Sequence, residues 1–198
     1  MNSNSGFGTR PRRAVALCAM TLAWAAVAGA QPRAIDAEKS VMTVRVSKAG
    51  VFSALGHDHE IAAPIAAGSV DTAARTVEIH IKTAAMKVRD PNASDKDRAE
   101  IQSTMLGPDV LDAAGHPEIV FRSTVSPGGA GSWTLNGNLM LHGQTHPVTV
   151  QVKEAGEHYS GTCQFKQTEF GITPIKVAGG TIKVKDEIRI EFDIQLAH

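Results

Sequence analysis

The sequence is poor in cysteine and in aromatic residues. It has two cysteines among 198 residues, and Phe, Trp and Tyr together make up 5% of the chain. If the N-terminal segment is removed on export, as expected below, Cys163 is the one cysteine that remains, so an intramolecular disulfide cannot staple the fold. We expect Cys163, which lies in a strand-like stretch, to be a small buried apolar residue rather than a reactive thiol.

The sequence also lacks an excess of charge of either sign and a long apolar run. Its 20 Lys and Arg balance its 20 Asp and Glu. Removal of the N-terminal segment would take away three arginines and leave a mildly acidic chain, which argues against a nucleic acid as partner because phosphate binding draws on clustered Lys and Arg. The apolar run at residues 14–27 is too short and too rich in alanine to span a bilayer, which needs about 20 strongly apolar residues.

Residues 1–30 have the composition of an export signal. A basic stretch precedes the apolar run, and Ala28-Gly29-Ala30 supplies a small-x-small cleavage site. We therefore expect cleavage near Ala30, a single mature domain at residues 31–198, and a periplasmic or secreted location. The Arg12-Arg13 pair leaves the twin-arginine route as the less favoured alternative.

Alternation of apolar and polar residues dominates the rest of the chain. It is clearest in "EIRIEFDIQL" at residues 187–196, where every second side chain is apolar. The stretches "TVEIHIK" and "HPVTVQV" repeat the pattern, which is typical of strands with one face in water. Further strands are expected in "SVMTVRVSK", "DHEIAAPIAAGSV", "EIVFRSTV", "SWTLNGNLMLHG" and "HYSGTCQFKQTEFGI".

One segment, "SDKDRAEIQSTMLGPDVLDAAGHP", breaks the alternation. It predicts a helix that begins at Ser94 or Asp95 and stops at Gly107-Pro108, followed by a second short helical piece that ends near Gly115. Many strands with one helical insertion indicate a mainly all-β fold, an antiparallel sheet of about eight strands closed into a barrel. A sandwich is the alternative, and closure is favoured because it removes exposed sheet edges.

The insertion has an apolar side that suits either of two roles. It can lie over one mouth of the barrel as a lid, or it can plug the core, and the sequence does not separate these roles. The residues of this side are Ile101, Met105, Leu106, Val110 and Leu111.

Three stretches of the sequence resemble the YceI-like family. They are "HPEIVFRSTV" at 116–125, "GNLMLHGQTHPVTVQV" at 137–152, and the ending from Thr168, "TEFGI" followed by "DEIRIEFDIQL". Their order and spacing are those of that family, whose members are exported, lipocalin-like antiparallel barrels that hold a long isoprenoid chain in the lumen. The resemblance implies the same fold and the same class of ligand, with no chemistry on it.

The chain departs from the family pattern between residues 47 and 61. Where many members have a strand that runs into His-Leu-Gly-Phe-Ser, this chain has "SKAGVFSALGHDHEI". Gly50 and the pair Phe52-Ser53 are kept, whereas the later Gly-x-Phe-x-x-Phe becomes a stretch that contains His57 and His59. These residues are expected near one end of the barrel.

Small inward residues would leave room for a slender ligand. Ala62, Gly137, Gly161 and Cys163 are expected to face a lumen that Phe or Leu would otherwise fill. Each methylene moved from water into such a lumen contributes roughly 0.8 kcal/mol. A packed core without a ligand is the alternative. The expected lumen residues are Val44, Val46, Phe52, Val77, Ile79, Ile81, Met105, Leu106, Ile119, Phe121, Trp133, Leu135, Leu139, Phe165, Ile190 and Phe192.

The pair His57 and His59 raises a second hypothesis, a site for Zn²⁺ or Cu²⁺. Two imidazoles on one face of a strand can chelate a metal when a third ligand is near. The sequence places no third ligand beside them, and a turn in which Asp58 caps backbone amides explains the same residues. A periplasmic metal-binding or stress-response protein is therefore the runner-up function.

No catalytic function is expected. Ser53 or Ser123 with His142 and an Asp makes a triad on paper, but the sequence lacks the Gly-x-Ser-x-Gly pattern of a nucleophile elbow. We expect no cofactor other than a bound lipid or isoprenoid. A filled barrel that acts through its surface on a membrane redox partner is a third hypothesis, so a transient contact with a membrane or membrane protein stays open, and the oligomeric state is not set.

Overall fold

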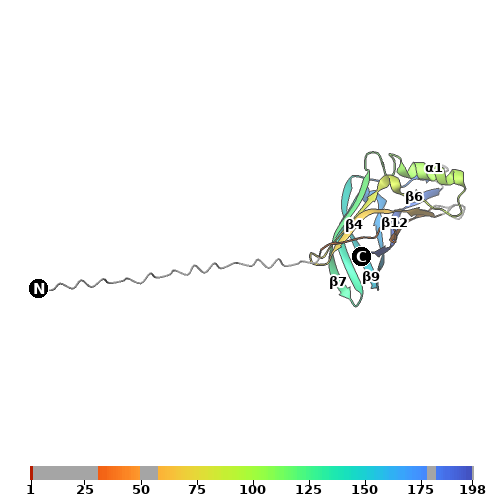
Figure 1. Cartoon of the computed structure of the whole chain (residues 1–198). Helices are drawn as coiled ribbons and strands as arrows, with labels where there is room; N and C mark the ends of the chain where they lie inside the picture. The colour runs from red at the N-terminus through yellow and green to blue at the C-terminus, as the bar shows by residue number, and fades with distance from the viewer. Residues whose placement is uncertain (2–30, 50–57, 178–181, 198) are drawn as a thin grey trace.

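The computed structural model describes Met1 and residues 31–49, 58–177 and 182–197, and most of this chain forms one antiparallel sheet (Figure 1). Apart from Met1, the expected export signal lies outside the described residues. The same holds for Phe52, Ser53 and His57. In the described part, no helix combines the length and the hydropathy needed to cross a membrane.

The strands follow the alternation in the sequence. In the sheet they are ordered β1-β4-β5-β7-β8-β9-β10-β12-β2-β3-β6, with every pair antiparallel. Their bounds are β1 (Arg33–Ala34), β2 (Val41–Ala49), β3 (His59–Ala62), β4 (Ile65–Asp71), β5 (Thr76–Lys82), β6 (Lys87–Val88), β7 (Glu118–Gly129), β8 (Ser132–Leu141), β9 (Gln144–Ala155), β10 (His158–Lys166), β11 (Lys176–Val177) and β12 (Ile182–Gln195).

A bend at Pro64 joins the two sides of the sheet. β3 pairs with β2, whereas β4, which is separated from β3 by Ala63 and Pro64, pairs with β5. Proline has no N–H to donate to a ladder, so the strand changes its partner there. The single strand expected for "DHEIAAPIAAGSV" is therefore bent into two pieces that serve opposite sides of the sheet.

A second closure involves the N-terminal residues of the described chain. β1 pairs with β4, and the amide of Ile35 donates to the carbonyl of Gly68 at 2.9 Å. On its other side, Asp36 N–H donates to the carbonyl of Gln195 at the end of β12 at 2.8 Å. Residues 33–36 thus fill the gap between β4 and β12.

These two closures make the sheet a barrel. When β3 and β4 are counted as one bent strand, the described part has eight long strands: β2, β3–β4, β5, β7, β8, β9, β10 and β12. The predicted fold class, a mainly antiparallel β-barrel with one helical insertion, is confirmed. We call the end of the barrel that carries the β4–β5, β7–β8 and β9–β10 turns the hairpin end, and the opposite end, beside the helix, the helix end (Figure 1).

The helix α1 (Asp95–Leu106) begins and ends as predicted. The Ser94 hydroxyl accepts a hydrogen bond from Asp97 N–H at 3.1 Å, which is a side-chain N-cap. The expected second helical piece is wrong, because residues 108–115 form turns instead. Asp112 has a φ of 42°, in the left-handed region, so a right-handed helix cannot continue through it.

The three stretches that resemble the family meet at the helix end. The His116 and His142 rings lie 5.0 Å apart, edge to face. His142 and Gly143 both have positive φ and form the two-residue β8–β9 turn. His142 Nδ1 donates to the carbonyl of Phe170, which is 0% exposed and lies in the 3-10 helix η3 (Gln167–Phe170). These residues hold the end of the barrel together rather than face a ligand.

Gly161→Ala tests how closely β9 and β10 approach each other. A Cβ on Gly161 would overlap the backbone oxygen of Gln151 and would lie 2.8 Å from Cζ of Phe192. Because a backbone oxygen cannot yield without disturbing the ladder, we expect a loss of about 1–3 kcal/mol in the free energy of unfolding. Urea denaturation measures it. Gly128→Ala is the control, since its nearest atoms lie at 3.3 to 3.5 Å, and equal losses for both variants would contradict the assignment.

Candidate ligand-binding cavity

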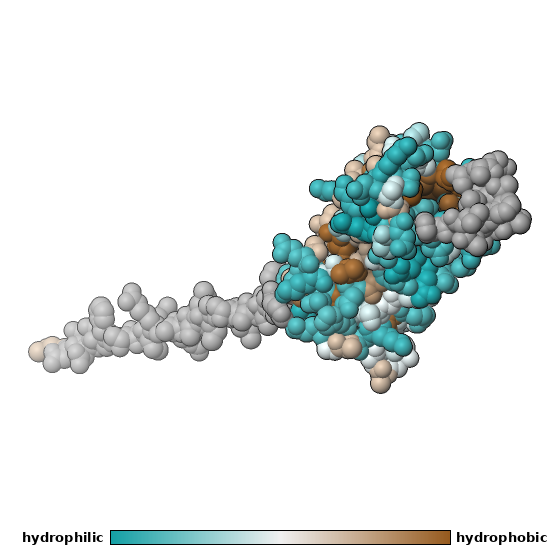
Figure 2. Space-filling view, turned by 90° about the vertical axis from the view of Figure 1, so that its right-hand side faces the viewer, coloured by the Kyte–Doolittle hydropathy of each residue, from teal (hydrophilic) through white to brown (hydrophobic). Residues whose placement is uncertain are grey.

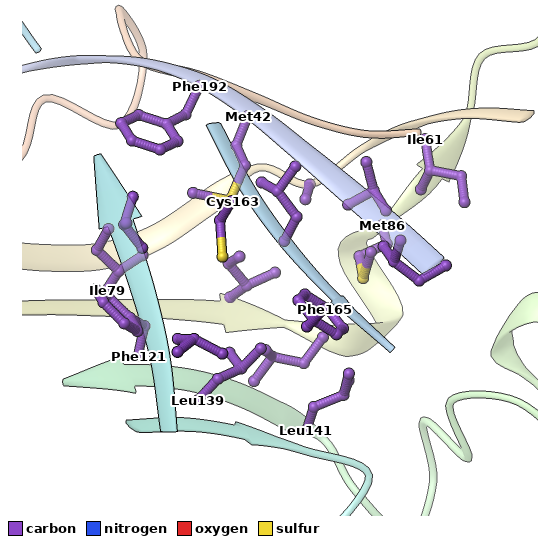
Figure 3. Close-up of a pocket in the computed structure, with 18 of the residues that line it drawn as sticks. Met42, Ile61, Ile79, Met86, Phe121, Leu139, Leu141, Cys163, Phe165 and Phe192 are labelled. Atoms are coloured by element: carbon purple, nitrogen blue, oxygen red, sulfur yellow. The ribbon is translucent and has the colours of Figure 1, made fainter. Parts of the chain in front are cut away.

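A cavity of about 950 Å³ occupies the interior of the barrel. Its wall reaches from Met105 in α1 and Leu111 after it to Pro127 and Trp133 at the hairpin end. The wall is largely apolar, and Figure 3 shows Met42, Ile79 and Phe165 among the side chains that surround it. Binding sites for small molecules have volumes of roughly 300–1,000 Å³, so this cavity lies at the large end of that range.

The lumen residues expected from the sequence fall into three groups. Leu106 packs against the core but does not line the cavity, because Met105 at the end of α1 faces it instead. Phe52 lies outside the described residues. The others all lie on the wall: Val44, Val46, Val77, Ile79, Ile81, Met105, Ile119, Phe121, Trp133, Leu135, Leu139, Phe165, Ile190 and Phe192.

Several wall residues were not selected from the sequence. β9 contributes Val148, Val150 and Val152, whose alternation in "HPVTVQV" was the available signal. At the bend, Ala63 lines the cavity, and the expectation for Ala62 is wrong because Ile61, its neighbour in β3, takes the inward position. The remaining apolar ones include Ile35, Met42, Met86, Leu141, Ile172, Ile175, Val184 and Ile188.

The two strand glycines do not leave open space beside the lumen. A Cβ on Gly137 would lie 2.7 Å from Cε2 of Phe121, and one on Gly161 would lie 2.8 Å from Cζ of Phe192. An aromatic ring therefore occupies the space beside each glycine, a packing that also covers the backbone there. The expectation that these glycines hollow the lumen is wrong. They make room for two of the few aromatic residues.

Cys163 is buried on the cavity wall, as its strand-like surroundings predict (Figure 3). Burial raises the pKa of its thiol, and a hydrogen bond from the backbone of Gln164 offsets this only in part. An apolar environment disfavours the thiolate, which is the nucleophilic form. Cys163 thus behaves as a small apolar wall residue and serves as a probe of the cavity.

Three side chains of the wall at the hairpin end, Glu154, Trp133 and Tyr159, are bound to one another. Glu154 accepts hydrogen bonds from Trp133 Nε1 at 2.9 Å and from the Tyr159 hydroxyl at 3.2 Å. Burial raises the pKa of Tyr159, and the negative charge of Glu154 adds to this. Arg33 Nη2 donates to the carbonyl of Ala197 at 3.1 Å. The side chains that narrow this mouth are therefore held in place by partners within the barrel.

The helix end carries a different set of polar residues. Figure 2, which views the molecule from the right-hand side of Figure 1, shows hydrophobic side chains recessed between hydrophilic ones. His59 lines the cavity here, and its Nδ1 lies 2.6 Å from Oδ2 of Asp90, which is 1% exposed. The other polar wall residues at this end are Lys48, Asp97, Glu100, Thr104, Gln167 and Lys183.

The metal hypothesis and the triad hypothesis find no assembled site in the described chain. His57 lies outside the described residues, and no group of three His, Cys, Asp or Glu side chains elsewhere in the described part could hold a metal ion. Ser123 is buried, and its hydroxyl has no hydrogen-bond partner among the described residues. His142 is bound instead to the carbonyl of Phe170, and Ser53 is not described.

Comparisons with known proteins agree with this architecture. The family model for the YceI-like domain matches residues 34–196. A UPF0312 protein of Shewanella sp. (strain W3-18-1) is 26% identical over 170 residues, which cover 79% of this chain and 85% of that protein. A UPF0312 protein of Azotobacter vinelandii is 30% identical over 110 residues, half of this chain and 53% of that protein.

Solved structures show the same fold. BcnA of Burkholderia cenocepacia is 21% identical and superposes with a TM-score of 0.58 over 83% of this chain and 99% of its own. A mutant YceI protein of Campylobacter jejuni, crystallised with a monobromobimane guest, is 13% identical, with a TM-score of 0.50 over 70% of this chain and 81% of its own.

Asp90→Ala tests the pairing with His59. The substitution leaves two donors, His59 Nδ1 and the amide of Glu60, which lies 2.6 Å from Asp90 Oδ1, without their acceptor. We expect the free energy of unfolding to fall by about 1–3 kcal/mol. Thermal or urea unfolding measures it. The control is Glu60→Ala, since the ion pair of Glu60 with Arg45 is exposed and should contribute less than about 1 kcal/mol. An equal loss in both variants would refute a special role of Asp90.

Alkylation of Cys163 tests its burial. Because burial raises the pKa of the thiol, the fraction of thiolate stays small until the pH exceeds the ordinary range for cysteine. In a Cys18→Ser background, we expect the rate of reaction with iodoacetamide to rise at higher pH than for an exposed thiol. The control is Cys163→Ala with Gln164→Cys, which moves the thiol to the exposed face of β10. Identical pH profiles for the two proteins would contradict the buried position.

Proposed function

Since the chain belongs to the YceI-like family, we propose that it binds an isoprenoid or another long-chain lipid in its barrel lumen and carries, stores or senses that lipid without altering it. The observation that carries the proposal is the cavity of about 950 Å³ with an apolar wall that reaches from one end of the barrel to the other. A slender apolar chain fits such a space.

The affinity of such a ligand comes from burial of its chain. Each methylene transferred from water contributes roughly 0.8 kcal/mol, so a chain with about ten buried carbons gains roughly 8 kcal/mol before the costs of ordering are subtracted. The middle of the cavity supplies side chains such as Val150, Cys163 and Ile190, which offer no strong hydrogen bond to a ligand. Selection among apolar chains of equal length therefore depends on the ends of the cavity.

The proposal includes an exported setting. The basic, apolar and small-x-small pattern of residues 1–30 supports a periplasmic or secreted location. A lipid that leaves or enters a membrane needs an apolar compartment during its passage through water, and the barrel supplies one. A transient contact with a membrane or a membrane protein follows from this role.

Native mass spectrometry tests the proposed function directly. The protein is expressed with its own N-terminal segment and purified from the periplasm without detergent or chelator. We expect an adduct of several hundred daltons that partitions into organic solvent. A protein that carries no such adduct, and that takes up none from added geranylgeraniol or hexadecanol, would overturn the proposal. A single metal ion as adduct would instead revive the hypothesis of a site at His57 and His59.

Cys163→Phe tests whether the cavity is the binding site. The larger side chain would fill part of the lumen beside Cys163. Loss of space for about three methylenes weakens binding by roughly 2 kcal/mol, about thirtyfold in affinity. Gln164→Phe, on the exposed face of the same strand, is the matched control and should bind like the unaltered protein. Titration with geranylgeraniol measures both, and equal affinities would place the ligand elsewhere.

A further inference from the structure

Two basic side chains lie side by side on the cavity wall at the helix end. On β2, Val44, Val46 and Lys48 line the cavity at every second position. Val46 is paired with His59 of β3, so Lys48, two residues beyond Val46, is the diagonal neighbour of His59 on the same face of the sheet. The apolar wall of β2 thus ends in an ammonium group beside an imidazole.

Asp90 holds His59 from behind. The carboxylate is 1% exposed and does not line the cavity. Its Oδ1 accepts from the amide of Glu60 at 2.6 Å, and its Oδ2 lies 2.6 Å from Nδ1 of His59. Because a carboxylate only accepts, His59 Nδ1 donates to it, which fixes the ring. The other ring nitrogen, Nε2, has no hydrogen bond among the described residues.

The loop that carries Asp90 is itself tied to the helix. Arg98 of α1 donates from Nη1 to the carbonyl of Asp90. Gln102, one turn further along, accepts from Val88 N–H at 2.8 Å and donates to the carbonyl of Met86 at 2.9 Å. α1, β6 and the His59–Asp90 pair therefore form one rigid support, and a group positioned by such a support offers a ligand a fixed geometry.

Lys48 is a cation in a partly apolar place. Its side chain is half-buried, and burial lowers its pKa, while the negative charges of Asp58 and Asp90 raise it to a lesser extent. The Asp58 carboxylate accepts from the backbone amide of Lys48 at 3.1 Å and from the Ser47 hydroxyl. Within the described chain, the ammonium of Lys48 has no carboxylate within ion-pair distance. An ammonium group has three donors and no acceptor.

The other charged residues of this mouth lie further out. Asp97 and Glu100 of α1 and Lys183 of β12 are exposed, so water screens their charges. At the hairpin end, by contrast, Glu154 already accepts from Trp133 and Tyr159. The basic wall residues of that end, Arg33 and Arg75, are exposed. The half-buried cation without a carboxylate partner in the described chain, Lys48, is therefore at the helix end.

We propose that the helix end of the lumen binds the anionic head of the ligand, a carboxylate or a phosphate on a long apolar chain, with Lys48 and the Nε2 side of His59 as the contacting groups. This rests on the proposed function and narrows its ligand class. The apolar chain then runs past Cys163 toward the hairpin end. An anionic head would give the Lys48 ammonium a hydrogen-bonded counter-charge in place of the water that burial removes.

Ligands of equal chain length and different head test this proposal. The delipidated protein is titrated by calorimetry with hexadecanol, hexadecanoate and hexadecyl phosphate. Because a charge-assisted hydrogen bond is about twice as strong as a neutral one, we expect at least one of the two anions to bind about tenfold or more tightly than the alcohol. The stronger anion identifies the head as a carboxylate or a phosphate.

Variants of Lys48 locate the head. Lys48→Met, which keeps the aliphatic stem, is expected to lower the affinity for the anions to about that for the alcohol, and Lys48→Arg is expected to retain the preference. The matched control is Lys82→Met, which removes an exposed charge at the same end but outside the cavity wall. A melting curve confirms that each variant is folded. If Lys48→Met does not fold, the comparison of Lys48→Arg with the unaltered protein still tests the preference for anions.

The outcomes separate the two proposals. Equal affinities for all three ligands, or a preference that survives Lys48→Met, overturn the anionic head and leave lipid binding standing. A preference that falls equally in Lys82→Met and Lys48→Met reflects net charge alone and also overturns it. If none of the ligands binds, the proposed function itself fails.

Discussion

Closure of the sheet is the constraint on which the interior depends. An open sheet of these strands would have two free edges and one apolar face in water. Pro64 bends one strand so that it pairs with β2 on one side and β5 on the other. Residues 33–36 fill the gap between β4 and β12 with backbone hydrogen bonds. Once the sheet is closed, the apolar side chains of every strand face the same interior space and form the cavity wall.

The alternation predicted the wall well because it depends on neighbours in sequence. Every second residue from Ile188 in β12 to Leu196, just after this strand, lines the cavity, as the pattern of "EIRIEFDIQL" indicates. The errors occur where position depends on distant residues. Ala62 faces outward because β3 pairs Ile61 with Val44 of β2, which puts Ile61 and then Ala63 on the cavity side. The pair of His59 with Asp90 joins residues 31 apart in sequence, and no local pattern shows it.

The stretches that resemble the family and the stretch that departs from its pattern contribute differently to the helix end. His116, His142 and Phe170 belong to the shared stretches, and they contact one another at the helix end. His59 and Lys48 lie in the stretch that departs from the family pattern, and both face the cavity. The shared stretches thus supply contacts that close the helix end as well as apolar wall residues such as Phe121 and Leu139, whereas the divergent stretch adds polar groups to the lumen. A family match therefore predicts the barrel better than the identity of its ligand.

The middle of the cavity and its two ends differ in the kind of interaction that they offer to a ligand. The free energy of burying an apolar chain grows with the chain's length and depends little on its other features. Under the proposed function, a wall of Val, Ile and Cys163 discriminates little between apolar chains of similar length. Discrimination requires a group whose interaction differs between ligands, and a partly desolvated charge such as Lys48 supplies it, because its energy depends strongly on whether the partner is charged. Under the proposed function, few residues therefore decide which lipid the barrel prefers, although many form its wall.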